Sequence, residues 1–110
     1  MTVRPKGISI LAQTKKERVL NDIDPLARRF QALSVGTRLR ILCLLRNHTL
    51  CVGALAARLD VTQGAVSQHL RILRDAGFVE AERKGSHVHY QLSQEALTGW
   101  SDVLERVFQH

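Results

Sequence analysis

The chain has few of the residues that build disulfide scaffolds, stacking platforms or membrane spans. Its 110 residues include two cysteines, two prolines and 5% aromatic residues. Two cysteines do not make a disulfide scaffold, and so few aromatics provide few surfaces on which single-stranded RNA bases could stack. No apolar run approaches the roughly twenty residues that span a bilayer. No sustained apolar stretch follows the basic residues near the N-terminus, as a signal peptide would require. These features predict a cytoplasmic protein with no membrane partner.

Motifs of catalysis are also missing. The sequence contains no Gly-rich phosphate loop, no nucleophile elbow and no metal-protease histidine pair. Its carboxylates, such as Asp75, Glu80 and Glu95, are scattered over different predicted elements with no pairing suggested. The sequence therefore predicts a protein that is not an enzyme and holds no cofactor.

Positive charge is what the chain has in excess. Sixteen Lys and Arg against ten Asp and Glu give a formal net charge of +6, which favours a polyanionic partner such as nucleic acid. The apolar content of 45% and the length of 110 residues suit one folded domain. We expect residues 1–21 to form a flexible basic tail and residues 22–110 to form the DNA-binding and dimerisation domain.

The most informative segment begins at Thr62, a good helix N-cap residue. Val66, Leu70 and Leu73 then recur at helical spacing and predict one apolar stripe against a core. Gly77 follows where a helix C-terminus favours a left-handed residue. The opposite face carries short polar and basic side chains, which suit a helix lying in a DNA groove: Gln63, Gly64, Ser67, Gln68, Arg71 and Arg74.

A short basic hairpin follows this helix directly. Residues 78–83 and 87–92 alternate as two strands, joined through Lys84, Gly85 and Ser86. A helix that could lie in a DNA groove, followed by a basic hairpin, is typical of a winged helix-turn-helix. The predicted fold class is therefore mainly α with a small β-hairpin, with about five helices and a two-stranded wing.

The remaining helices are marked by caps and apolar spacing. Asp24 and Pro25 read as an N-cap and a first helical residue. Residues 39–45 form a strongly apolar helix, expected at the buried centre of the fold. A short helix over residues 52–59 then leaves about three connecting residues before the next helix, as a helix-turn-helix requires.

The terminal segment, residues 93–110, has more apolar surface than one small core needs. The usual solution is a two-fold dimer in which terminal helices pack across subunits. Such a dimer would place two recognition helices about 34 Å apart, matching a palindromic operator in double-stranded DNA. The alternative is a helix that packs entirely on its own core. The expected interface residues are Leu26, Phe30, Trp100, Leu104, Val107 and Phe108.

Three segments together resemble one known family. FQALSVGTRLRILCLL, LCVGALAARLDVTQGAVSQHLRILRDAGFVEAERKG and SHVHYQLS are similar to the ArsR/SmtB family of small bacterial winged-helix repressors. The resemblance covers residues 24–97. It implies a homodimer with five main helices and a β-wing, whose repression is relieved by a small inducer. It also implies that DNA is read at Gln63, Gly64, Ser67 and Gln68, with wing contacts near Arg83, Lys84 and His87.

The chemistry of these residues favours the same division of roles. Gln63 and Gln68 can each present a donor and an acceptor to a base edge. Arg71, Arg83 and Lys84 suit phosphate contacts, which position a protein without specifying sequence. The alternative interpretation is a winged helix that serves as a protein-interaction module. It would predict an acidic or apolar recognition face instead of a polar and basic one.

The sensing chemistry stays open at this point. The thiolate cluster of the family's arsenic and cadmium sensors is reduced to Cys51, and the terminal segment lacks the Asp-x-His pair of its zinc sensors. Cys43 matches one cysteine of the oxidation-sensing branch, and Cys51 is its only available partner. The favoured interpretation of Cys43 is a buried, inert thiol. A third reading joins Cys43, His48 and Cys51 in a non-standard metal site. No metal is named, and the inducer is unknown.

Overall fold

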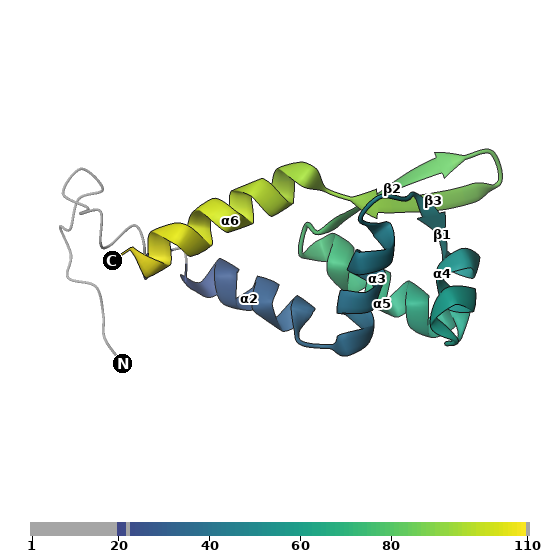
Figure 1. Cartoon of the computed structure of the whole chain (residues 1–110), viewed down its shortest axis with the longest axis horizontal. Helices are drawn as coiled ribbons and strands as arrows, with labels where there is room; N and C mark the ends of the chain where they lie inside the picture. Colours follow the sequence, from purple (N-terminus) through teal and green to yellow (C-terminus); the bar gives the residue numbers. More distant parts are fainter. Residues whose placement is uncertain (1–19, 22, 110) are drawn as a thin grey trace, which may run out of the picture.

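The computed structural model describes residues 20, 21 and 23–109. Most of the expected tail, residues 1–21, lies outside these residues. The described part contains five helices and one three-stranded sheet (Figure 1). Within it, no helix is both long and apolar enough to cross a membrane. The elements in chain order are α2 (Ile23–Leu33), α3 (Gly36–Leu45), β1 (Leu50–Cys51), α4 (Val52–Leu59), α5 (Gln63–Asp75), β2 (Val79–Lys84), β3 (His87–Leu92) and α6 (Gln94–Phe108).

One apolar core joins α3, α4, α5 and the start of β2. The predicted stripe of α5 is confirmed, because Val66, Leu70 and Leu73 are all at most 1% exposed. Phe78 closes the core beside them at 1% exposure. Burying such side chains is the main favourable term in folding, so this core holds α5 in one orientation. The other members of the core are Ala32, Ile41, Leu45, Leu55, Ala56 and Val79.

Local signals set the ends of α5 as the sequence predicts. The Thr62 hydroxyl accepts a hydrogen bond from the Ala65 amide at 3.1 Å, which satisfies one of the free amides of the first turn. Gly77 follows the helix with φ +87°, a left-handed conformation that glycine adopts without steric cost. The turn between α4 and α5 uses a second left-handed residue, Asp60, with φ 55°. These caps fix the helix-turn-helix.

The sheet has one more strand than expected. β2 and β3 form the predicted hairpin, and Gly85 takes φ +63° in its two-residue turn. β1 adds antiparallel to the other side of β3, so the strand order is β1-β3-β2. Its register pairs Leu50 with Tyr90 and Cys51 with His89. The expected two-stranded wing is correct for the hairpin but misses β1, because a strand of two residues has no readable period.

Two helical expectations need correction. Helix α2 begins at Ile23, so Asp24 lies in its first turn and does not cap it. Leu20 and Asn21, which precede α2, are helical as well. Pro25 lies in the first turn of α2, where a proline is tolerated. Helix α3 is only partly buried, because Leu39 is 46% exposed while Ile41 and Leu45 lie in the core.

Helix α6 projects from the rest of the molecule toward the free end of α2 (Figure 1). The Ser93 hydroxyl caps it by accepting from the Ala96 amide at 3.2 Å. No residue of α6 is buried. The helix therefore has apolar surface that its own protomer does not cover.

Candidate nucleic-acid interface

The polar face of α5 is fully presented to solvent. Because its apolar stripe faces the core, the residues expected to read DNA lie on the opposite side, and all are exposed. A side chain added at Gly64 would meet no atom within 4 Å, so the backbone there is open to close approach. The exposed set is Gln63, Gly64, Ser67, Gln68 and Arg71.

The tip of the wing holds the second group of expected contacts. Lys84 and His87 face each other across the β2–β3 register, and Arg83 lies one pair further back. All three side chains are exposed. The Ser86 hydroxyl and the Nδ1 atom of His87 lie 3.1 Å apart in a hydrogen bond, which restrains the imidazole. Two cations therefore stand at the end of a rigid hairpin, where a duplex flanking α5 could meet them.

One basic residue on this surface was not in the predicted contact set. Arg74 lies seven residues after Ser67, on the same exposed side of α5 as Ser67 and Arg71. These residues line a hollow of about 380 Å³ between α5 and β3, which Tyr90 closes on the sheet side. The sequence places Arg74 on the polar face of this helix, since residues i and i+7 share a face, but the predicted contacts stop at Arg71. The hollow lies between the recognition helix and the sheet from which the wing extends.

A separate surface carries the residues expected at the dimer interface. We call it the α2–α6 face, formed by Phe30, Trp100, Leu104, Val107 and Phe108. Phe30 is 46% exposed and Phe108 is 81% exposed, while the other three are half-buried. The Trp100 ring packs edge-on to Phe30, with ring centroids 5.3 Å apart, and to Phe78 at 5.5 Å.

Leu26 is placed differently from the other expected interface residues. It is 4% exposed within the protomer, so little of its surface is left for a partner. Two apolar residues outside the expected set are also exposed: Leu20 at 60%, and Ile23, the first residue of α2, at 38%.

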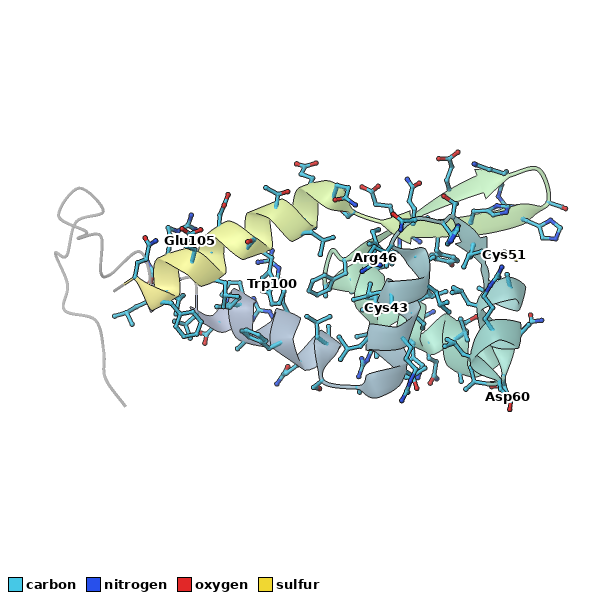
Figure 2. The ribbon with its side chains drawn as sticks, in the orientation of Figure 1. Cys43, Arg46, Cys51, Asp60, Trp100 and Glu105 are labelled. Atoms are coloured by element: carbon cyan, nitrogen blue, oxygen red, sulfur yellow. The ribbon has the colours of Figure 1, made fainter. Side chains whose placement is uncertain are left out.

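The two cysteines are both free thiols, and Cys43 is not buried. It is exposed on α3, while Cys51 is half-buried in β1. The reading of Cys43 as a buried, inert residue is therefore wrong. Figure 2 labels Cys43 on the helix and Cys51 at the edge of the sheet. Among the described residues, no group of three His, Cys, Asp or Glu side chains could hold a metal ion. Cys43, His48 and Cys51 thus do not assemble the metal site considered from the sequence.

Comparisons with known proteins agree with this geometry. A sequence model of the bacterial regulatory proteins of the arsR family matches residues 36–81, which span α3 to the start of β2. The transcriptional activator HlyU of Vibrio cholerae is 37% identical over 78 residues, covering 71% of this chain and 72% of that protein. A transcriptional repressor SmtB homologue of Synechocystis is 40% identical over 74 residues, covering 67% of this chain and 56% of that protein.

A solved structure matches most of the chain as well. It is the homodimeric winged helix-turn-helix DNA-binding domain of a possible ArsR-family transcriptional regulator from Mycobacterium bovis. The two chains share 29% sequence identity with a TM-score of 0.67, and the match covers 89% of this chain and 90% of that one. The similarity therefore reaches beyond the helix-turn-helix to the helices around it.

Proposed function

Because the chain belongs to the ArsR/SmtB family of winged helix-turn-helix transcriptional regulators, we propose that it is a homodimeric repressor of a palindromic operator, released by a chemical signal. The observation that carries the proposal is the exposed polar face of α5, fixed by a buried stripe and standing beside a basic wing. An acidic or apolar face, as a protein-interaction module would present, is not what α5 offers. The protein would act in the bacterial cytoplasm, where operator DNA lies.

The N-terminal half of α5 enters the major groove in this proposal. Gln63 and Gln68 read base edges, because an amide side chain can donate to and accept from one base at the same time. Ser67 tolerates several bases, since a hydroxyl can donate or accept. The missing side chain of Gly64 lets the helix approach the duplex closely, which its open surroundings support.

Phosphate contacts come from the basic residues around this helix. Arg71 and Arg74 lie on the side of α5 that faces the wing, and Arg83 and Lys84 stand near the wing tip. Their charges would neutralise backbone phosphates and hold the helix in register without reading sequence. His87, opposite Lys84, lies within reach of the same strand of DNA.

Dimerisation uses the α2–α6 face. A helix without a single buried residue, with Phe108 81% exposed, is explained if a second copy covers it. The Mycobacterium bovis domain is homodimeric, which supports a dimer of this chain. A two-fold axis at this face would carry two copies of α5 to successive major grooves, about 34 Å apart on a palindromic site.

The sign of regulation follows from where the operator lies. One relative is named an activator and another a repressor, so the fold serves both. We favour repression, because a dimer seated over a promoter blocks the polymerase sterically and needs no further contact. A reporter gene placed behind the DNA upstream of the gene for this protein tests repression, since deletion of that gene should raise expression of the reporter.

The exposed thiol of Cys43 supports oxidation as one candidate release signal. An accessible thiol can react with a persulfide donor, whereas a buried one cannot. We expect such a donor to lower DNA affinity, reductant to restore it, and Cys43→Ser to abolish the response. Cys51→Ser serves as the matched variant that separates a single reactive thiol from a pair. Unchanged affinity in the wild type would remove both cysteines from sensing.

The decisive experiment compares Gln68→Ala with Lys84→Ala on upstream DNA over a salt series. Gln68→Ala should cost about 1–3 kcal/mol on the operator and little on unrelated duplex. Lys84→Ala should weaken both duplexes alike and reduce the slope of log affinity against log salt by about one. Absence of affinity for any duplex would overturn the proposed function, and equal loss of specificity in both variants would overturn the division of roles.

A further inference from the structure

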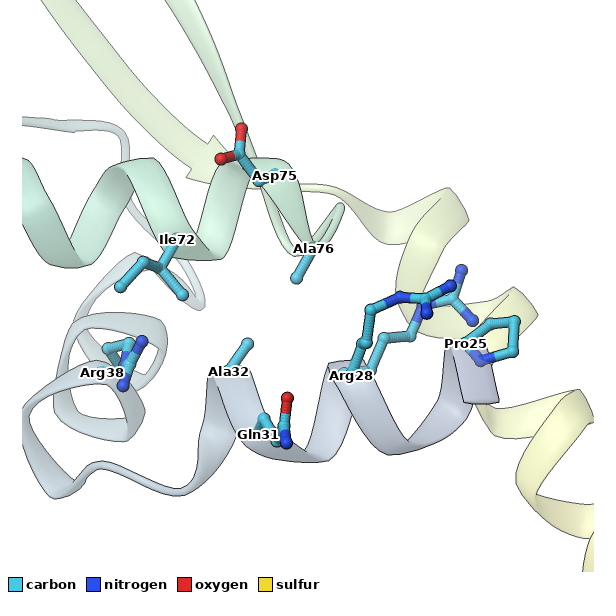
Figure 3. Close-up of a pocket in the computed structure, with 9 residues that line it drawn as sticks. Pro25, Arg28, Gln31, Ala32, Arg38, Ile72, Asp75 and Ala76 are labelled. Carbon is cyan, nitrogen blue, oxygen red and sulfur yellow. The ribbon is translucent and has the colours of Figure 1, made fainter. Parts of the chain in front are cut away.

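A cleft separates the dimerisation end of the molecule from the recognition helix. It has a volume of about 540 Å³ and lies between α2, α3 and the C-terminal end of α5 (Figure 3). This volume falls within the range of about 300–1,000 Å³ found for small-molecule sites. None of the residues proposed to contact DNA lines it. The lining residues include three arginines and four apolar residues.

The arginines give the cleft its charge. Arg28 and Arg29 come from α2 and Arg38 comes from α3. The Nε atom of Arg38 is buried and has no hydrogen-bond partner among the described residues. A buried N–H group without a partner costs free energy unless a ligand or water satisfies it. Guanidinium groups bind carboxylate, sulfonate and phosphate with paired hydrogen bonds. The polar part of the cleft thus suits an oxyanion.

The one carboxylate in the lining does not cancel this charge. Asp75 lies at the last turn of α5, and its carboxylate points away from α2 in the close-up (Figure 3). In the same view, Arg28 and Arg38 stand on either side of Ala32. An anion between α2 and α5 would therefore meet cations at the ends of the cleft and no carboxylate in its middle.

The walls between the arginines are apolar. Ile72 of α5 and Ala76, the residue that follows this helix, face Ala32 of α2 across the cleft (Figure 3), and Pro25 lies nearer the start of α2. Ile72 is 41% exposed, which is unusual for an isoleucine beside a core and would be relieved by an occupant. A duplex presents its phosphates on a convex surface. An apolar cleft with charged ends instead fits a small molecule.

We propose that this cleft binds a small organic anion, with a carboxylate, sulfonate or phosphate head on Arg38 and an apolar body that extends between α2 and α5 toward Arg28. The inference rests on the proposed function, for which the anion is the releasing effector. Helix α2 carries Phe30, which packs on Trp100 of α6, and α5 carries the DNA-reading face. An occupant touches both helices and so changes the spacing of the two recognition helices across the dimer.

The test uses 1-anilinonaphthalene-8-sulfonate as the probe, with the full chain as a dimer. This fluorophore has an aromatic body and one sulfonate. N-phenyl-1-naphthylamine has nearly the same body without the charge, and so reports apolar binding alone. We expect saturable binding of the sulfonate at one site per protomer. Saturating probe should lower affinity for upstream DNA in a gel-shift assay about fivefold or more.

Three variants locate the site. Arg38→Gln should weaken sulfonate binding about tenfold, the value expected for losing one charge-assisted contact. Arg28→Gln, which removes a charge at the other end of the cleft, should weaken it about twofold. Neither variant should affect binding of the neutral analogue. Arg58→Gln is the matched control, because Arg58 is exposed on α4 and, within the described part of the chain, donates a hydrogen bond only to the Ala54 carbonyl of its own helix. Arg28 is exposed, so its variant tests the inference even if Arg38→Gln fails to fold.

The outcomes separate this inference from the proposed function. Binding that is non-saturable, equal for the neutral analogue, or unchanged in Arg28→Gln would overturn the anion site while leaving DNA binding intact. Binding at the cleft with unchanged DNA affinity would overturn the effector role. A loss of DNA affinity and salt slope in Arg28→Gln, with unchanged probe binding, would assign the arginines to the DNA backbone and also overturn it. Absence of DNA binding before any probe is added would instead count against the proposed function.

Discussion

Helices α5 and α6 have similar sequence patterns but differ in how far the fold buries their apolar faces. Each starts at a hydroxyl cap, Thr62 or Ser93, and each has an apolar stripe at helical spacing. In α5 the stripe is at most 1% exposed. In α6, which is two residues longer at 15 against 13, no residue is buried. Amphipathic spacing therefore predicts that the apolar face of a helix packs against another surface. It does not predict whether that surface belongs to the same chain.

The difference lies in what surrounds each helix. Helix α5 is enclosed by α3, α4 and the start of β2, whereas α6 packs chiefly against α2. Trp100 is the anchor of α6, since it touches both Phe30 and Phe78, and it points from α6 toward α2 (Figure 2). Beyond Trp100 the helix leaves the core. We attribute the uncovered part to the partner protomer.

The largest expected effect is a cavity in the α5 stripe. Leu73 is 0% exposed, so Leu73→Ala should lower the free energy of unfolding by about 3 kcal/mol. Chemical denaturation followed by circular dichroism measures this. Leu104→Ala is the matched change on α6, where the leucine is half-buried. Its effect on the free energy of unfolding should shrink as the protein is diluted, because an interface contact stabilises the protein only while the dimer is populated. An effect of Leu104→Ala that is independent of concentration would mean that α6 packs on its own protomer.

A charge at the end of α6 should act on assembly alone. Phe108 is 81% exposed, so Phe108→Asp should change protomer stability by less than about 0.5 kcal/mol. Placing a carboxylate in an apolar interface should weaken dimerisation at least tenfold, about 1.4 kcal/mol. Sedimentation equilibrium measures the dissociation constant. Gln109→Asp, one residue further along, is the control for added charge. Equal dissociation constants for Phe108→Asp and wild type would contradict the proposed interface.

The smallest expected effects are those of the two caps. Thr62→Ala should cost about 1 kcal/mol, because the Ala65 amide loses its acceptor. Ser93→Ala removes the equivalent bond to Ala96 and should cost a similar amount or less, since α6 contributes less to the core. Thermal melts of both variants test the order. A larger loss in Ser93→Ala would show that α6 is more firmly integrated than its exposure suggests.

The helix-turn-helix was predictable because its signals are local. Thr62, Asp60 and Gly77 lie at the ends of helices, where capping and left-handed residues follow from backbone sterics. The stripe of α5 follows from helical spacing. The same local rules place Gln63, Ser67 and Gln68 on the exposed face, as the structure has them. Strand β1 escaped notice because it is stabilised only by pairing with β3, a contact distant in sequence.

The exposure of Cys43 was not predictable for a related reason. Its neighbours in ILCLL are apolar, and a local reading puts the thiol in the core. The core of α3 instead takes Ile41 and Leu45, and a helix turns residue 43 to a different side from both. Which side of α3 is covered depends on where α4, α5 and α2 pack. The residues next to Cys43 in the sequence carry no information about that packing.

Sequence alone determined the two ends of α5, the polar face of that helix, the position of the turn in the basic wing, and the membership of a bacterial regulator family. Those properties depend on interactions within a few residues or on a recognisable pattern. Only the tertiary structure decided that Leu26 is inside the protomer while Phe108 is outside, and that Arg28, Arg29 and Arg38 line one cleft. Such facts depend on how α2, α3 and α5 pack together, because burial is a property of all the surfaces that meet at a point.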